Sequence, residues 1–156
     1  MEAIILAGGL GTRLRETVTD VPKPMAPISE RPFLEYLLNY WIGQGVDRFI
    51  CSVGYKWEII QNYFGSSYKG AAIEYSIEKT PLGTGGGVML ALNKLDKKQP
   101  CLLLNGDTFF KVPLANFLEF HNQEGAEISL ALHHVSGANR YDWVILNSDS
   151  SVQRFE

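Results

Sequence analysis

Apolar residues along the chain form short continuous runs that alternate with segments of helical spacing. The uninterrupted apolar run at 3–7 predicts a strand buried on both faces. Segment 32–44 begins at a proline, repeats apolar side chains at helical spacing and stops at Gly43 or Gly45, which predicts a helix. Strands are also predicted at 48–53, 71–77, 100–104 and 128–135, helices at 58–64, 88–95 and 113–121, and a hairpin from 143–146 and 152–155. The alternation predicts an α/β fold, with a Rossmann-like, mostly parallel sheet and helices on both faces.

A glycine-rich loop follows the first predicted strand. Gly8, Gly9 and Gly11 carry no Cβ, so their backbone N–H groups can approach an anion closely. Arg13 adds a permanent cation in a fork that suits phosphate oxygens. No Lys-Ser or Lys-Thr follows as the Walker pattern requires, and Leu14 stands where the dinucleotide pattern needs its third glycine. The loop therefore predicts a phosphate site of another kind, and the alternative is a tight turn.

Lys23 lies between two prolines. Pro22 and Pro24 favour extended backbone on either side of it and limit its movement. A lysine ordered in this way loses less entropy when it meets a charged ligand. The pattern predicts a pre-positioned cation, and the alternative is a solvated lysine in a rigid connector.

Glycines also crowd segment 78–87, which leads into a predicted helix. Four glycines there allow close approach of a ligand to the backbone, unless the segment is only a flexible connector. Glu78 opens the segment. Its carboxylate accepts two hydrogen bonds side by side, which matches the ring N–H and exocyclic amine of guanine. The segment therefore favours a guanine nucleotide, unless Glu78 is a strand-end glutamate in water.

Asp107 follows the predicted strand at 100–104, directly after Gly106. In open parallel sheets, ligands bind outside the carboxyl ends of the strands. A carboxylate at such an end can hold a hard divalent cation, and Mg²⁺ takes one or two carboxylates together with phosphate oxygens and waters. The position predicts a Mg²⁺ ligand, and the alternative is an ordinary turn.

Composition sets the outer limits. The chain has 156 residues, 46% of them hydrophobic and 20% charged, which predicts one soluble domain over 1–156 with a real core. A net charge of −3 gives no reason to expect nucleic acid or a membrane surface as a partner. We expect no targeting leader and no membrane span. The two cysteines, Cys51 and Cys101, lie in apolar runs and are expected to be buried free thiols in a reducing cytoplasm.

Two segments together resemble the signature of a known family. Residues 6–14, Leu-Ala-Gly-Gly-Leu-Gly-Thr-Arg-Leu, and residues 22–25, Pro-Lys-Pro-Met, are similar to the signature of the sugar-phosphate nucleotidyltransferases, also called nucleotide-sugar pyrophosphorylases. The resemblance covers essentially the whole chain. It implies the nucleotide-diphospho-sugar transferase fold, which is GT-A-like. The implied reaction is attack of a sugar 1-phosphate oxygen on the α-phosphorus of a nucleoside triphosphate, with release of pyrophosphate.

The same resemblance implies roles for individual residues. Arg13 would neutralise the departing pyrophosphate, Lys23 would bridge the α-phosphate and the incoming sugar phosphate, and Asp107 would hold Mg²⁺. Fixed cations and N–H groups would then supply most of the catalysis, because negative charge crowds the reacting centre. The nucleotide-binding residues that the resemblance implies are Leu6, Ala7, Gly8, Gly9, Gly11, Thr12, Glu78, Pro81, Gly83 and Thr84.

Within the family, segments 23–28, 81–86 and 104–110 look most like those of enzymes that join GTP to D-glycero-α-D-manno-heptose 1-phosphate. Enzymes that use mannose 1-phosphate, or another sugar 1-phosphate, are the alternative. The resemblance implies a GDP-sugar product for surface polysaccharide such as lipopolysaccharide or capsule, and it is compatible with a homo-oligomer. Family members are longer, so the chain is expected to be their nucleotide-binding portion and to turn over poorly alone.

Two alternatives come from other classes. A nucleotide-sensing regulatory module would keep this fold without turnover, and the presence of Arg13, Lys23 and Asp107 argues against it. An enzyme that joins CTP to another phosphorylated alcohol, such as phosphocholine, would read the mixed donor and acceptor edge of cytosine. Glu78 suits that edge less well than it suits guanine.

Overall fold

The computed structural model describes residues 1–9, 20–96, 99–134 and 143–156. Two compact units divide the chain, Met1–Asn116 and Phe117–Glu156. Each is described here by itself. The predicted sites at Gly11, Thr12 and Arg13 lie outside the described residues.

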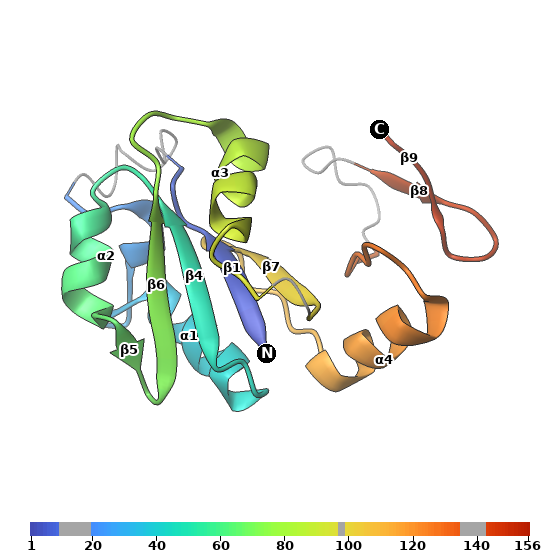
Figure 1. Ribbon diagram of the computed structural model, residues 1–156, viewed down its shortest axis with the longest axis horizontal. Coiled ribbons are helices and arrows are strands. Elements are labelled where there is room, and N and C mark those ends of the chain that lie inside the picture. The colour runs from blue at the N-terminus through green and yellow to red at the C-terminus, as the bar shows by residue number, and fades with distance from the viewer. Residues whose placement is uncertain (10–19, 97–98, 135–142) are drawn as a thin grey trace. The chain divides into compact units, whose positions relative to one another are not determined.

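The first unit is built on a sheet of five strands in the order β5-β6-β4-β1-β7 (Figure 1). Four of its strands run parallel to their neighbours, as predicted. A two-residue strand, β5, pairs antiparallel with the edge of β6. The bounds are β1 Glu2–Leu6, β4 Arg48–Val53, β5 Ser67–Tyr68, β6 Ala71–Ile77 and β7 Cys101–Asn105.

Helices cover both faces of this sheet. Figure 1 shows α3 (Gly83–Leu92) in front of the strands and α1 (Phe33–Gly43) behind them. A third helix, α2 (Trp57–Phe64), follows β4. Because the central strands are covered on two sides, Ile4 and Ile50 are buried together with Ala91 of α3. The predicted layered α/β architecture is therefore confirmed.

Lys23 begins a short 3₁₀ helix, η1 (Lys23–Met25), so the prediction of extended backbone on both sides of it is wrong. Of the two flanking prolines, Pro22 has extended backbone and Pro24 lies within the 3₁₀ helix. The chain turns because Met25 N–H donates to the Pro22 carbonyl at 2.8 Å and Ala26 N–H donates to the Lys23 carbonyl at 3.1 Å. A short ribbon follows, formed by β2 (Pro27–Ile28) and β3 (Arg31–Pro32).

Helix α3 begins at Gly83, whereas the sequence predicted a helix at 88–95 preceded by a loop. The prediction failed because glycine has poor intrinsic helix propensity. In this structure the glycines are part of the first turns of a helix packed on the sheet. The first turns of α3 therefore bring glycine backbone to the carboxyl edge of the sheet, where Gly83 and Gly87 line the pocket.

Helix α4 (Leu114–Glu124) crosses from the first unit into the second. The second unit also contains the predicted hairpin, formed by β8 (Val144–Leu146) and β9 (Val152–Phe155). The strand predicted at 128–135 is absent from the described part of that segment, 128–134. An alternating apolar pattern becomes a strand only when a neighbour supplies ladder hydrogen bonds, and no described strand does so. Ile128, Leu130 and Leu132 remain exposed there.

Among the described helices, none has the length and apolar character that crossing a membrane requires.

Candidate active site

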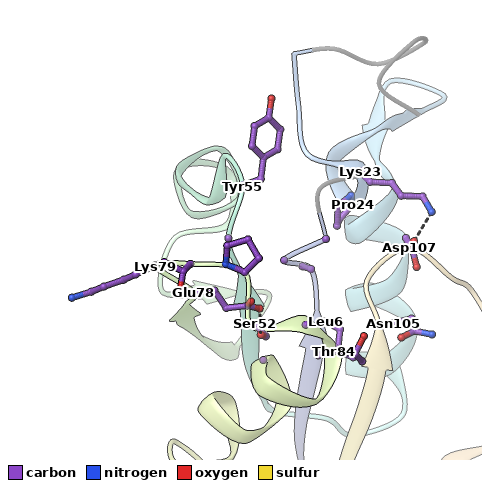
Figure 2. Close-up of a pocket in the computed structure, with 18 residues that line it drawn as sticks. Leu6, Lys23, Pro24, Ser52, Tyr55, Glu78, Lys79, Thr84, Asn105 and Asp107 are labelled. Atoms are coloured by element: carbon purple, nitrogen blue, oxygen red, sulfur yellow. Dashed lines mark hydrogen bonds and ion pairs between the residues drawn. The ribbon is translucent and has the colours of Figure 1, made fainter. Parts of the chain in front are cut away.

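A pocket of about 850 Å³ opens at the carboxyl ends of the four parallel strands (Figure 2). This is the edge at which the sheet topology predicted a ligand site. Its walls come from the segments that directly follow β1, β4, β6 and β7, and from η1 and α3. The lining residues are Leu6, Ala7, Gly8, Gly9, Lys23, Pro24, Ser52, Gly54, Tyr55, Glu78, Lys79, Thr80, Pro81, Gly83, Thr84, Gly87, Asn105 and Asp107.

Every described residue that the sequence assigned to the site lines this pocket. Segments far apart in the chain bring them together, since η1, β6 and β7 each contribute. The residues concerned are Leu6, Ala7, Gly8, Gly9, Lys23, Glu78, Pro81, Gly83, Thr84 and Asp107. Their chemical roles stay predictions, and those of Gly11, Thr12 and Arg13 lie outside the described part of the chain.

Lys23 and Asp107 form an ion pair at the pocket wall, as Figure 2 shows. The ammonium Nζ of Lys23 donates to Oδ2 of Asp107, although 84 residues separate the two in sequence. Both side chains are about one-third exposed, at 36% and 37%. Thr108 Oγ1 donates to the other carboxylate oxygen of Asp107 at 3.3 Å. A cation and an anion therefore face the same hollow, where a ligand carrying both phosphate and metal can reach them.

Glu78 follows β6 and directs its carboxylate into the pocket beside Ser52 (Figure 2). Its own N–H donates to the Val53 carbonyl at 2.8 Å, which fixes the backbone at the strand end. The Leu82 N–H donates to Oε2 at 3.1 Å, and the Ser52 hydroxyl lies 3.4 Å from Oε1. The carboxylate is thus held by protein donors and still faces the pocket.

Sequence reasoning missed several lining residues, among them Ser52 and Asn105. Both lie opposite Leu6 in the register of the parallel strands, Ser52 on β4 and Asn105 on β7. For Ser52 the available signal was a polar residue near the end of segment 48–53, and that segment was interpreted only as a strand. Asn105 directly follows the predicted strand at 100–104 and lies two residues before Asp107, but it was given no role.

A metal site made of protein ligands alone does not fit the described residues, because no group of three His, Cys, Asp or Glu side chains is present among them. Asp107 offers one carboxylate within a pocket large enough for a nucleotide. One carboxylate completed by phosphate oxygens and waters is a normal Mg²⁺ arrangement. The donor set therefore fits a metal that arrives with a triphosphate.

Both cysteines are free thiols, as predicted; Cys51 is buried as expected, whereas Cys101 is only partly buried. Burial raises the pKa of the Cys51 thiol to about 12 and also raises the pKa of Cys101. Thiols with raised pKa values are poor nucleophiles near neutral pH. Neither cysteine lines the pocket.

Fold and pocket together define an α/β protein with a ligand pocket at the carboxyl ends of its parallel strands. The chain belongs to the nucleotidyl transferase family, whose model matches residues 2–156. Enzymes of this family generally use a divalent metal.

Two relatives are D-glycero-alpha-D-manno-heptose 1-phosphate guanylyltransferases. The one from Aneurinibacillus thermoaerophilus is 48% identical over 156 residues, which is the whole of this chain and 67% of the relative. The one from Campylobacter jejuni is 44% identical, again over the whole chain and 68% of the relative. The crystal structure of HddC from Yersinia pseudotuberculosis, complexed with GMP-PN, matches with a TM-score of 0.79 and 32% identity, covering 99% of this chain and 68% of that one.

Proposed function

We propose that the pocket binds GTP together with Mg²⁺ and that the protein transfers the guanylyl group to D-glycero-α-D-manno-heptose 1-phosphate. The products are the GDP-sugar and pyrophosphate. The observation that carries this proposal is the meeting of Lys23, Glu78 and Asp107, from three separate segments, in one pocket. The identity of 48% to a guanylyltransferase of that specificity supports the choice of substrates.

Charge explains why these side chains suit the reaction. A triphosphate and a sugar phosphate bring several negative charges together, so their approach requires cations and fixed N–H donors. The Lys23 ammonium supplies a cation at the pocket wall, and Gly8 and Gly9 expose backbone to the ligand. Asp107 would hold the Mg²⁺ that neutralises the phosphates. Arg13 is assigned to the leaving pyrophosphate by sequence alone.

The Lys23–Asp107 ion pair would separate if both side chains bound the ligand. Asp107 would hold the Mg²⁺ and Lys23 would contact phosphate oxygens, so each charge would exchange one partner for another. The pair is partly exposed, and such pairs contribute about 1 kcal/mol or less to stability. The exchange therefore costs little compared with the gain from a magnesium-bound triphosphate.

Glu78 would select the base. Guanine presents two adjacent donors, N1–H and the 2-amine, to a carboxylate that can accept both. Leu82 and Ser52 use only part of the acceptor capacity of Glu78, so acceptor positions remain for a base in the pocket.

The mannose 1-phosphate alternative has support of its own. Mannose-1-phosphate guanylyltransferase from Mycobacterium tuberculosis is 35% identical over 99% of this chain, although the chain covers only 43% of it. The sugar therefore has to be tested directly.

Isothermal titration calorimetry with GTP, CTP, UTP and dTTP, each with and without Mg²⁺, tests the nucleotide assignment. We expect GTP to bind most tightly, and only with Mg²⁺. Pyrophosphate release from GTP is then compared with heptose, mannose and glucose 1-phosphates as acceptors. Equal binding of all four nucleotides would overturn the guanine assignment. Because the chain spans about two thirds of the length of the two heptose 1-phosphate guanylyltransferases, slow pyrophosphate release that depends on one sugar phosphate is the expected result. GTP binding with no release above the rate without a sugar phosphate would instead favour a nucleotide-sensing module.

A further inference from the structure

Ser52 is one of two buried hydroxyls that lie side by side in the sheet. It lies one residue before the end of β4 and is 1% exposed. Its neighbours in register are Leu6 on β1 and Ser76 on β6. Burying a hydroxyl is unfavourable unless it finds a hydrogen-bond partner. The partner within reach is the carboxylate of Glu78, with 3.4 Å between Ser52 Oγ and Glu78 Oε1.

The two oxygens of the Glu78 carboxylate meet different protein donors. Oε1 faces the Ser52 hydroxyl, and Oε2 accepts the Leu82 N–H at 3.1 Å. One donor on each oxygen restricts the rotation of the carboxylate, the Leu82 N–H at an ordinary hydrogen-bond distance and the Ser52 hydroxyl at a longer one. An ionised carboxylate has about four acceptor positions, so roughly two stay available to a ligand in the pocket.

Backbone without side chains encloses Oε1 on two sides. A Cβ at Gly8 would lie 2.8 Å from this oxygen, and a Cβ at Gly87 would lie 2.7 Å from it. The same Cβ at Gly87 would lie 3.0 Å from Ser52 Oγ. The carboxylate therefore fits between the loop after β1 and the first turns of α3, and the Ser52 hydroxyl lies beside it on the sheet.

We infer that Ser52 is a positioning residue for base selection: its hydroxyl holds the Glu78 carboxylate in the orientation that accepts both adjacent donors of a guanine. Ser52 acts through Glu78 and does not react itself. The inference rests on the proposed function, because it presumes that Glu78 reads the base. It adds that selectivity depends on the orientation of the carboxylate as well as on its charge.

Inosine triphosphate provides the test, because its base keeps N1–H and lacks the 2-amine. A correctly oriented carboxylate loses one of two hydrogen bonds with this analogue. We expect the unaltered protein to bind Mg²⁺–GTP about tenfold or more tightly than Mg²⁺–ITP in calorimetry. Ser52→Ala should reduce this preference to about a third of its value or less, and Glu78→Gln should reduce it at least as much.

Ser76 supplies a matched control. It lies directly beside Ser52 in the register of β6 and is equally buried, at 1% exposure. Its hydroxyl has no hydrogen-bond partner among the described residues, and it does not line the pocket. Ser76→Ala therefore deletes the same group one strand away, and it should leave the GTP-to-ITP preference unchanged. Ser52→Cys, which retains the size and a weak donor, should give a preference between those of Ser52→Ala and the unaltered protein.

The outcomes separate the two proposals. An unchanged preference in Ser52→Ala, together with a lost preference in Glu78→Gln, would overturn the role of Ser52 and leave the proposed function intact. An equal loss in Ser52→Ala and Ser76→Ala would also overturn it, since packing would then be the cause. If Glu78→Gln keeps the full preference, the base assignment itself fails. Should Ser52→Ala not fold, as judged by circular dichroism, Ser52→Cys decides by the same ratio.

Discussion

At the scale of single residues, the pocket holds two opposite charges that neutralise each other in the protein alone. Lys23 and Asp107 are each about one-third exposed, so water screens their attraction. Neither is buried enough for its loss to damage the core. Separating this pair would therefore cost the fold little stability.

Replacing either Lys23 or Asp107 should weaken the binding of Mg²⁺–GTP and leave the free energy of unfolding nearly unchanged. We expect Asp107→Asn and Lys23→Met each to weaken Mg²⁺–GTP binding by on the order of tenfold or more, because each removes a charge-assisted contact. The free energy of unfolding should change by about 1 kcal/mol or less. Calorimetry and urea unfolding measure the two quantities.

Glu58→Gln is the control for a lost carboxylate, since Glu58 is exposed on α2 and outside the pocket. It should leave GTP binding unchanged, and it should lower the free energy of unfolding by about 1 kcal/mol or less, because Glu58 is a first-turn carboxylate of α2. A large loss of stability in Lys23→Met with normal GTP binding would contradict the assignment of this pair.

At the scale of elements, the first turns of α3 combine weak helix formers with a close approach to Glu78 and Ser52. Gly87→Ala should weaken GTP binding by on the order of tenfold, because its Cβ would come within 2.7 Å of Glu78 Oε1 and displace the carboxylate. Gly85 lies two residues earlier, and a Cβ there would meet nothing within 4 Å.

Gly85→Ala is therefore the matched control. It should raise the free energy of unfolding by about 0.5–1 kcal/mol, the usual gain of alanine over glycine in a helix, and leave GTP binding intact. Equal GTP affinity in the two variants would show that the close approach at Gly87 does not matter for the ligand.

Helices α1 and α2 are joined by a charged hydrogen bond that pH should control. Tyr63 O–H donates to Glu35 Oε2 at 2.7 Å, and this bond is the main reason that the pKa of Glu35 lies below its ordinary value of 4.5, against the opposing effect of burial. A carboxyl with a lowered folded-state pKa stabilises the fold above its unfolded pKa. That contribution is lost as pH falls through the folded-state pKa.

Tyr63→Phe should therefore destabilise the protein at pH 7, and the difference from the unaltered protein should shrink as pH falls below 4.5. Urea unfolding at a series of pH values measures it. Tyr36→Phe is the control, because Tyr36 donates to the uncharged Ile28 carbonyl. Its effect should not depend on pH in this range, and a parallel pH dependence in both variants would contradict the explanation.

The sequence predicts elements well where a pattern depends on the segment alone. Strands β4 and β6 match the predicted 48–53 and 71–77 at both ends, because short segments rich in β-branched and aromatic residues favour strands wherever they lie in the sheet. The start of α3 and the missing strand at 128–134 depend on distant partners. Glycines become helical where a sheet packs against them, and an alternating segment stays irregular where no strand pairs with it.

The same distinction applies to the site. The glycine loops, Glu78 and Asp107 were found because they follow predicted strands, and parallel strands gather their carboxyl ends at one edge. Lys23 was found from its flanking prolines and from the family resemblance. Ser52 escaped notice because its importance lies in a contact with Glu78, 26 residues away. Sequence patterns identify side chains that could meet a ligand more readily than those that orient other side chains.

At the scale of the whole first unit, the two ends of the sheet differ in structure. The carboxyl end forms the pocket, and the amino end is held by an ionic network around Arg48. The Arg48 guanidinium bonds to Glu2 on β1 and to Glu74 on β6, and it donates to the Lys94 carbonyl after α3 at 2.8 Å. Hydrogen bonds to Glu74 and Glu2 raise the pKa of Arg48, so the guanidinium stays charged.

Arg48→Met should therefore lower the free energy of unfolding and leave GTP affinity nearly unchanged, which is the reverse of the effect expected for Lys23→Met. Removing the cation leaves Glu2, whose side chain is only 12% exposed, without its charged partner, and we expect a loss of about 1–3 kcal/mol in the free energy of unfolding. GTP affinity, measured where the variant is fully folded, should stay within about twofold of the unaltered protein, because additivity holds between distant sites. The double variant with Lys23→Met should show the sum of the two separate losses. A GTP affinity that falls in step with stability would mean that the amino end of the sheet also sets the geometry of the pocket.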